Sequence, residues 1–136
     1  MASNGKRKPR RDDLVEIEFL ESLRRRRPGD ARILRALGDL YTRVGRIEEG
    51  LKVDLELVKL CPDESEAWYN LGCSYALLGE KDKAFDVLSR AVDLGYRDQE
   101  WLLEDVDLES LRQDPRFARL LYRIALGVPD ERRTET

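Results

Sequence analysis

The feature that most constrains this chain is an internal repeat with a period of about 34 residues. The motif of the first copy recurs in the same order in the second. The two sets are Leu37, Gly38, Tyr41 and Gly45, and then Leu71, Gly72, Tyr75 and Gly79. Pro28 and Pro62 are separated by the same interval. A period of this length is typical of a supersecondary unit that cannot bury its apolar face alone and must stack on its neighbours.

Each repeat is predicted to be a pair of helices. Over residues 67–78 the apolar side chains recur every three or four positions, which is the spacing of an amphipathic helix. Gly79 follows at the position where a left-handed residue often ends a helix. A second helix is predicted over residues 81–94. Gly72 and Ala84 have almost no side chain, so the two helix backbones are expected to approach closely there.

Residues 65–98 resemble one tetratricopeptide repeat, a helix-turn-helix unit of about 34 residues. The resemblance rests on the order and spacing of Trp68, Leu71, Gly72, Tyr75, Gly79, Ala84, Leu88 and Ala91. The sequence departs from the family pattern at Leu88, where Phe is usual, and at Tyr96, where Pro is usual. Both replacements keep an apolar group. The resemblance implies an all-α fold, a short right-handed α-solenoid of antiparallel helix pairs.

The repeats predict how the rest of the chain is organised. We expect a disordered basic arm over 1–11, a half-unit over 12–30, repeats over 31–64 and 65–98, a degenerate capping unit over 99–126 and a flexible tail over 127–136. The half-unit is a helix that lacks its partner helix, which leaves an open apolar edge. Its apolar stripe is expected to be Leu14, Ile17, Leu20 and Leu23, with Val15 and Phe19 beside it. Asp30 is expected to cap the next helix.

The capping unit begins like a repeat and then deviates. Asp105 and Asp107 interrupt the Leu-Gly pattern, and a short helical turn is expected over residues 108–112. Asp114 followed by Pro115 then predicts the start of a last helix. The inward stripe of that helix is expected to be Phe117, Leu120, Leu121 and Ile124. This segment resembles the one that ends many bacterial tetratricopeptide arrays.

The composition argues against catalytic and metal-binding functions. The 136 residues include no His, so the commonest general base and the imidazole ligand are both missing. Cys61 and Cys73 lack the spacing of a metal site, and we expect both to be reduced thiols. The sequence contains no phosphate loop, dinucleotide fingerprint or nucleophile elbow. We therefore predict a protein that is not an enzyme and that uses no cofactor or metal.

The sequence also predicts where the protein is found. No stretch approaches the ~20 consecutive apolar residues of a membrane span. The first residues are charged and lack the apolar core of a secretory signal. We therefore expect a cytoplasmic protein that does not contact membranes.

The family resemblance implies a binding surface. In this family the first helix of each repeat lines a concave groove that holds an extended peptide or a partner helix. The groove residues expected here are Arg32, Arg35, Asp39, Arg43, Tyr69, Asn70, Cys73, Leu77, Glu100 and Glu104. The alternative for any of them is an ordinary exposed side chain. The expected ligand is a protein or peptide with an acidic patch near Arg32 and Arg35, an apolar anchor beside Tyr69 and Leu77, and a basic patch near Glu104.

One subtype of the family is not expected. Its chaperone-binding members hold a C-terminal carboxylate with Lys, Asn and Arg side chains at fixed positions. This chain keeps only Asn70 of that set, and Glu100 and Glu104 stand where the family has basic residues. Two acidic groups would repel a carboxylate.

The favoured function is therefore a scaffold or a partner-specific chaperone, and two alternatives remain open. The first is a nucleic-acid or ribosome adaptor that uses Lys6–Arg11 together with Arg24–Arg27. We favour solvated basic segments instead, because no aromatic residues interleave the basic arm. Phosphate binding would weaken steeply between about 50 and 200 mM salt, whereas peptide binding would not. The second alternative is self-association through the open N-terminal edge.

Overall fold

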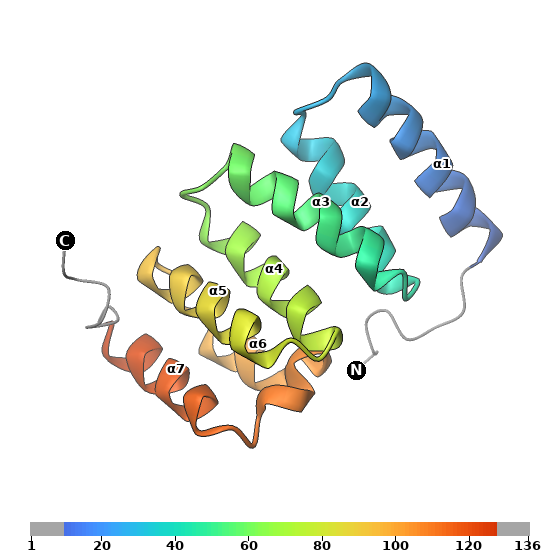
Figure 1. Cartoon of the computed structure of the whole chain (residues 1–136). Helices are drawn as coiled ribbons and strands as arrows, with labels where there is room; N and C mark the ends of the chain where they lie inside the picture. Colours follow the sequence, from blue (N-terminus) through green and yellow to red (C-terminus); the bar gives the residue numbers. More distant parts are fainter. Residues whose placement is uncertain (1–9, 128–136) are drawn as a thin grey trace. The chain divides into compact units, whose positions relative to one another are not determined.

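The computed structural model describes residues 10–127 (Figure 1). Within that range the chain is all α, as predicted, with seven α-helices, one 3-10 helix and no strand. They are α1 (Arg11–Arg26), α2 (Ala31–Arg43), α3 (Ile47–Leu60), α4 (Ser65–Leu77), α5 (Lys81–Asp93), α6 (Gln99–Glu104), η1 (Val106–Leu111) and α7 (Pro115–Leu126). None of these helices has the length and apolar character needed to cross a membrane. Most of the predicted arm and tail lies outside the described residues.

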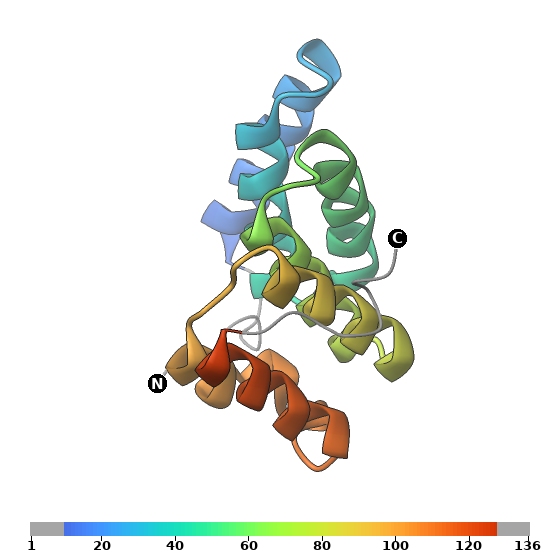
Figure 2. The same cartoon turned by 90° about the vertical axis from the view of Figure 1, so that its left-hand side faces the viewer.

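The helices belong to two compact units, an N-terminal unit (Met1–Pro62) and a C-terminal unit (Asp63–Thr136). In the N-terminal unit, α2 and α3 pack as a helix pair, and α1 packs against α2. In the C-terminal unit, α4 and α5 form the corresponding pair, η1 packs on α4, and α7 packs on α5 and α6. Figures 1 and 2 show α7 beside the segment that contains α6 and η1.

The close approach of the paired helices depends on glycine, as predicted. A Cβ atom added to Gly72 of α4 would lie 2.6 Å from Leu88 of α5. Packed carbon atoms normally stay about 3.5–4.0 Å apart, so a side chain at Gly72 would displace the Leu88 side chain from its packed position or push the helices apart. Gly38 of α2 makes the equivalent approach, because its added Cβ would lie 2.8 Å from Asp54 Oδ1. Ala84, the other small residue of the prediction, is fully buried.

Two aspartates cap helices where the sequence predicted them. The Asp30 carboxylate accepts a hydrogen bond from the backbone N–H of Arg32 at 3.0 Å, and Asp114 accepts one from that of Arg116 at 3.0 Å. Each arginine also folds its guanidinium back onto the same carboxylate, at 2.9 Å. The hydrogen bonds from Arg116 lower the pKa of Asp114 to about 2. Gly79, predicted to end a helix, has the expected left-handed backbone, with φ of 80°.

The apolar residues of α1 are unevenly buried. Ile17 is buried, but Leu14 is 46% exposed. Leu20 and Leu23 are only half-buried. The predicted apolar stripe is therefore fully buried only at Ile17. The physical reason is that α1 packs chiefly against α2, and a single neighbour covers only a narrow face of a helix.

At the other end of the chain, α7 covers α5. Phe117, Leu120 and Ile124 are buried, as predicted, and Leu121 is half-buried. Polar contacts join the same two helices. The buried Arg123 guanidinium of α7 donates to Ser89 Oγ at 2.8 Å and forms an ion pair with Asp93, both on α5.

Candidate partner-binding surface

The side of α4 where groove residues were expected is covered by the chain itself. The Tyr69 hydroxyl donates a hydrogen bond to Asp105 Oδ2 at 2.6 Å. Cys73 Sγ lies 3.6 Å from the same oxygen. Further along α4, Ser110 Oγ of η1 donates to the backbone carbonyl of Ala76 at 3.4 Å. The segment that contains η1 therefore occupies this side of α4, which we call the α4 face and define as Tyr69, Cys73, Ala76 and Leu77.

Asp105 fixes that segment in place. Its side chain is 2% exposed. Besides the bond from Tyr69 to Oδ2, its Oδ1 accepts from the backbone N–H of Asp107 at 3.0 Å, which caps η1. Its backbone carbonyl accepts from the Arg112 guanidinium at 2.7 Å. The Tyr69 ring also stacks on the ring of Tyr96, with centroids 4.6 Å apart. One carboxylate thus starts η1 and ties it to α4.

The titratable groups of the α4 face are held in their protonated forms. Burial, followed by the nearby Cys73 and Asp105, raises the pKa of the Tyr69 hydroxyl. Burial is also the main reason that the pKa of the Cys73 thiol is raised well above its ordinary value. A buried thiol that stays protonated is neither a nucleophile nor a good metal ligand. Sγ of Cys73 and carboxylate oxygens of Asp105 and Asp107 lie within 4.8 Å of one another. Asp105 already receives the hydrogen bonds described above, so this group is better explained as a buried polar network.

The expectation that Tyr69 and Cys73 are exposed groove residues is wrong. They are 5% and 6% exposed. Asn70 and Leu77, from the same helix, are half-buried. The burial of Tyr69 depends on Asp105, which is far away in the sequence. The sequence signal for this contact is the loss of the repeat pattern at residues 105–107.

The remaining expected residues of the C-terminal unit lie on α6. Glu100 and Glu104 are both exposed. α6 is only six residues long, against thirteen for α2 and for α4. A helix of fewer than two turns offers little surface to a ligand. The first helix of the capping unit thus contributes two exposed carboxylates, and its helical face is much shorter than those of α2 and α4.

In the N-terminal unit the expected residues lie on one side of α2, which we call the α2 face and define as Arg32, Arg35, Asp39 and Arg43. The Arg32 side chain is 79% exposed, with its guanidinium on Asp30. Asp39 is exposed and Arg35 is half-buried. The Arg43 side chain is 43% exposed, and its Nη1 lies 3.9 Å from Asp13 Oδ1 of α1. The face thus carries three arginines and one aspartate.

The two faces differ at equivalent positions of the repeat. One repeat period before Tyr69, Cys73 and Leu77 stand Arg35, Asp39 and Arg43, and Thr42 stands one period before Ala76. Uncharged side chains therefore stand where η1 packs, and charged side chains stand at three of the four equivalent positions of α2. Charged groups are expensive to bury without partners, so a charged face suits water or a complementary ligand better than a dry contact.

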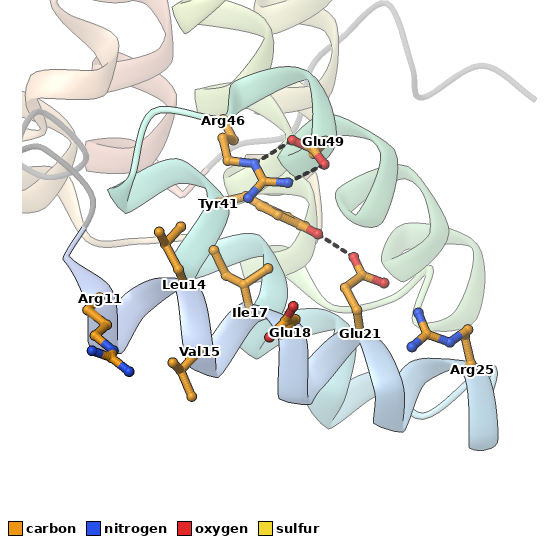
Figure 3. Close-up of a pocket in the computed structure, with 10 residues that line it drawn as sticks. All are labelled: Arg11, Leu14, Val15, Ile17, Glu18, Glu21, Arg25, Tyr41, Arg46 and Glu49. Atoms are coloured by element: carbon orange, nitrogen blue, oxygen red, sulfur yellow. Dashed lines mark hydrogen bonds and ion pairs between the residues drawn. The ribbon is translucent and has the colours of Figure 1, made fainter.

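A pocket of about 540 Å³ lies between α1, α2 and the start of α3 (Figure 3). The Tyr41 hydroxyl at its floor donates to the Glu21 carboxylate of α1. Arg46 lies over the Tyr41 ring, 5.1 Å from the centroid, and its guanidinium makes hydrogen bonds of 2.6 and 2.7 Å to Glu49. Burial, with help from Glu21, raises the pKa of Tyr41. The polar groups of the floor are thus paired with one another, and they join three helices.

The basic run Arg24–Arg27 is partly used within the N-terminal unit. Arg24 forms ion pairs with Glu21 and with Glu56 of α3. Arg27 Nη1 lies 4.0 Å from Asp30 Oδ2. Arg25 and Arg26 are exposed. Half of the run therefore has an internal structural role, which weakens the case for a continuous phosphate-binding strip. Lys6–Pro9, the other part of that prediction, lies outside the described residues.

Comparison with known proteins shows matches to a protein family and to a curated relative. Two family models, each described as a tetratricopeptide repeat, match residues 31–72 and 65–97. The chain is 33% identical over 84 residues to a chloroplastic protein of Arabidopsis thaliana. That alignment covers 60% of this chain and 25% of the plant protein. The shared region is therefore about a quarter of the relative's length.

Proposed function

The chain belongs to the tetratricopeptide-repeat family through residues 31–97, and we propose that it is a non-catalytic adaptor that binds an acidic segment of a partner protein on the α2 face. The family indicates a module for protein–protein interaction. The choice of the α2 face rests on one observation: η1 packs on the α4 face, while three of the four equivalent repeat positions of α2 carry charged side chains. A cytoplasmic location remains a prediction.

The charge of the α2 face gives the ligand its chemistry. Three arginines outnumber the one aspartate on the face itself, where Arg32 also pairs with Asp30 and Arg43 lies beside Asp13. Arginine forms paired hydrogen bonds with carboxylates, so Asp or Glu side chains of the ligand are the natural partners. One such paired interaction is present within the chain: the Arg32 guanidinium makes two hydrogen bonds to the Asp30 carboxylate, at 3.2 and 2.9 Å. Complementary charge sets the orientation of the ligand and rejects basic segments.

The chemistry of the described residues supports the non-catalytic part of this proposal. The tyrosines and the cysteine with strongly raised pKa values, Tyr41, Tyr69, Tyr96 and Cys73, are all protonated at neutral pH. A general base or a nucleophile needs the opposite shift. The sequence also contains no His to supply a base. These residues therefore support a binding function and not a catalytic one.

Fluorescence anisotropy with labelled peptides tests the proposal. Three peptides of equal length should be compared: one rich in Glu and Asp, one neutral, and one rich in Lys. The acidic peptide should bind best to the full chain. The Arg35→Glu variant should weaken that binding by roughly five- to thirtyfold, equivalent to about 1–2 kcal/mol, because reversing a charge replaces attraction by repulsion.

Arg119→Glu is the matched control, because it makes the same charge change on the exposed side of α7. It should leave the affinity for the acidic peptide nearly unchanged. Equal losses in the two variants would show that the peptide responds only to net charge, and would contradict the proposal. A preference for the neutral or the basic peptide would also contradict it. Binding of a single-stranded RNA at about 200 mM salt would favour the nucleic-acid alternative instead.

A further inference from the structure

α1 carries an exposed seam with the spacing of a coiled coil. We define the seam as Asp12, Val15, Phe19, Ser22 and Arg26. Its members are separated by three, four, three and four positions, which places them along one side of the helix. Val15 is 56% and Phe19 is 61% exposed. In Figure 3, Val15 points away from Tyr41, while Leu14 and Ile17 of the same helix point toward it.

The seam borders the side on which the repeat pattern calls for another helix. α1 corresponds to the second helix of a repeat, and Leu20 and Leu23 lie two repeat periods before Leu88 and Ala91 of α5. Those two α5 residues are 1% exposed, because α5 pairs with α4. Leu20 and Leu23 are only half-buried. They line an open pocket of about 260 Å³ together with Ile33 of α2, which marks the uncovered side.

The charges of the seam are arranged for an antiparallel partner with the same sequence. Asp12 lies at the N-terminal end of the seam and Arg26 at its C-terminal end. Both are exposed, and neither has a hydrogen-bond or ionic partner among residues 10–127. A two-fold axis beside Phe19 places Asp12 of each copy opposite Arg26 of the other, which gives two equivalent ion pairs. It also places Val15 opposite Leu23 of the second copy, so apolar contacts lie between the two ion pairs.

We propose that a second copy of this chain covers the α1 seam, with the two α1 helices antiparallel about Phe19. An isologous interface must be complementary to itself, and the seam meets this condition. A parallel arrangement would bring Asp12 onto Asp12 and Arg26 onto Arg26. The antiparallel one also opposes the helix dipoles. This surface is separate from the α2 face, so the dimer does not depend on the proposed function.

Sedimentation velocity of the full chain across the micromolar range tests the proposal. The wild type should shift from monomer to dimer as concentration rises. Asp12→Arg should raise the dimer dissociation constant by about tenfold or more, because the change acts on both symmetry-related pairs. Arg26→Asp should have the same effect. The double variant Asp12→Arg/Arg26→Asp restores opposite charges and should recover most of the affinity. Phe19→Asp, which places two like charges at the axis, should abolish the dimer.

Arg25→Asp is the matched control for Arg26→Asp. Arg25 is also exposed at the C-terminal end of α1, but it lines the Tyr41 pocket instead of the seam. It should leave the dimer unchanged. Far-UV circular dichroism on every variant separates loss of the dimer from loss of helix. A wild type that remains monomeric up to the highest concentration would overturn the proposal. So would a double variant that is no better than the single ones, or an equal loss in Arg25→Asp.

Discussion

The hydroxyl of Tyr69 donates a 2.6 Å hydrogen bond to the Asp105 carboxylate, which joins the first helix of the second repeat to the start of η1. Both side chains are buried. The contact explains why the second repeat does not offer the surface that the first one does. An aromatic residue that would be a ligand anchor in an open groove is here an internal support.

Removing that hydrogen bond is expected to destabilise the fold. Tyr69→Phe keeps the ring and its stacking on Tyr96 but takes one donor from the buried Asp105 carboxylate. The free energy of unfolding in urea should fall by about 1–3 kcal/mol. Tyr122→Phe, on a tyrosine that is 64% exposed, is the control and should change stability little. Peptide affinity of the Tyr69→Phe protein should stay close to the wild-type value. Equal stability of the two variants would show that the hydrogen bond contributes nothing.

A side chain at Gly72 should be tolerated poorly. Gly72→Ala places a methyl group where Leu88 already lies 2.6 Å away, and overpacking of this kind typically costs ~1–3 kcal/mol. Gly72→Leu should cost more. Adding Leu88→Ala to Gly72→Ala makes room for the methyl group and should give less destabilisation than the sum of the two single changes. Asn70→Ala, on the same helix, should leave the melting temperature almost unchanged. Additive effects in the double variant would contradict the packing argument.

The sequence predicted most of the fold but only part of the surface. The close packing at Gly72 and the Asp114 cap were predictable because each follows from a local sequence pattern. The glycine recurs in both repeats, and the aspartate precedes a proline at a helix start. The burial of Tyr69 was not, because it depends on where the deviant segment at Asp105 packs. The exposure of Leu14 could not be predicted either, since a periodic pattern shows which face is apolar but not how many neighbours cover it.

Breaking the contact between α5 and α7 should loosen the end of the C-terminal unit. Arg123→Met keeps much of the side-chain volume but removes the charge that faces Asp93. We expect the free energy of unfolding to fall by about 2 kcal/mol or more. The loss should be smaller than the ~3–5 kcal/mol that breaking a fully buried ion pair costs, because Asp93 keeps some contact with water. Hydrogen exchange should then rise first in α7. Adding Asp93→Asn should recover part of the loss, and no recovery would show that Arg123 acts only through packing.

The cap of α7 should make stability depend on pH in acid. The pKa of Asp114 is about 2 in the folded protein, because Arg116 and the helix start favour the carboxylate. A lowered pKa means that the stabilisation is present above the ordinary value of 3.8 and is lost as the pH falls through 2. Asp114→Asn keeps the cap without the charge. The wild type should melt at a higher temperature than this variant at pH ~5, and the difference should shrink toward pH ~2. Glu104→Gln is the control, and an equal pH-dependent difference there would contradict the assignment to Asp114.

The most direct test of the proposed function is to map where an acidic peptide binds. Backbone amide NMR signals of the full chain should be followed during titration with the Glu- and Asp-rich peptide. We predict that the largest shifts fall on residues 32–43 of α2, while Tyr69, Asp105 and the rest of η1 change little. Shifts centred on α4 and η1 would show that the covered face opens to bind the ligand, and would contradict the account. Shifts confined to residues 1–11 and 24–27 would contradict it as well, in favour of a basic electrostatic surface.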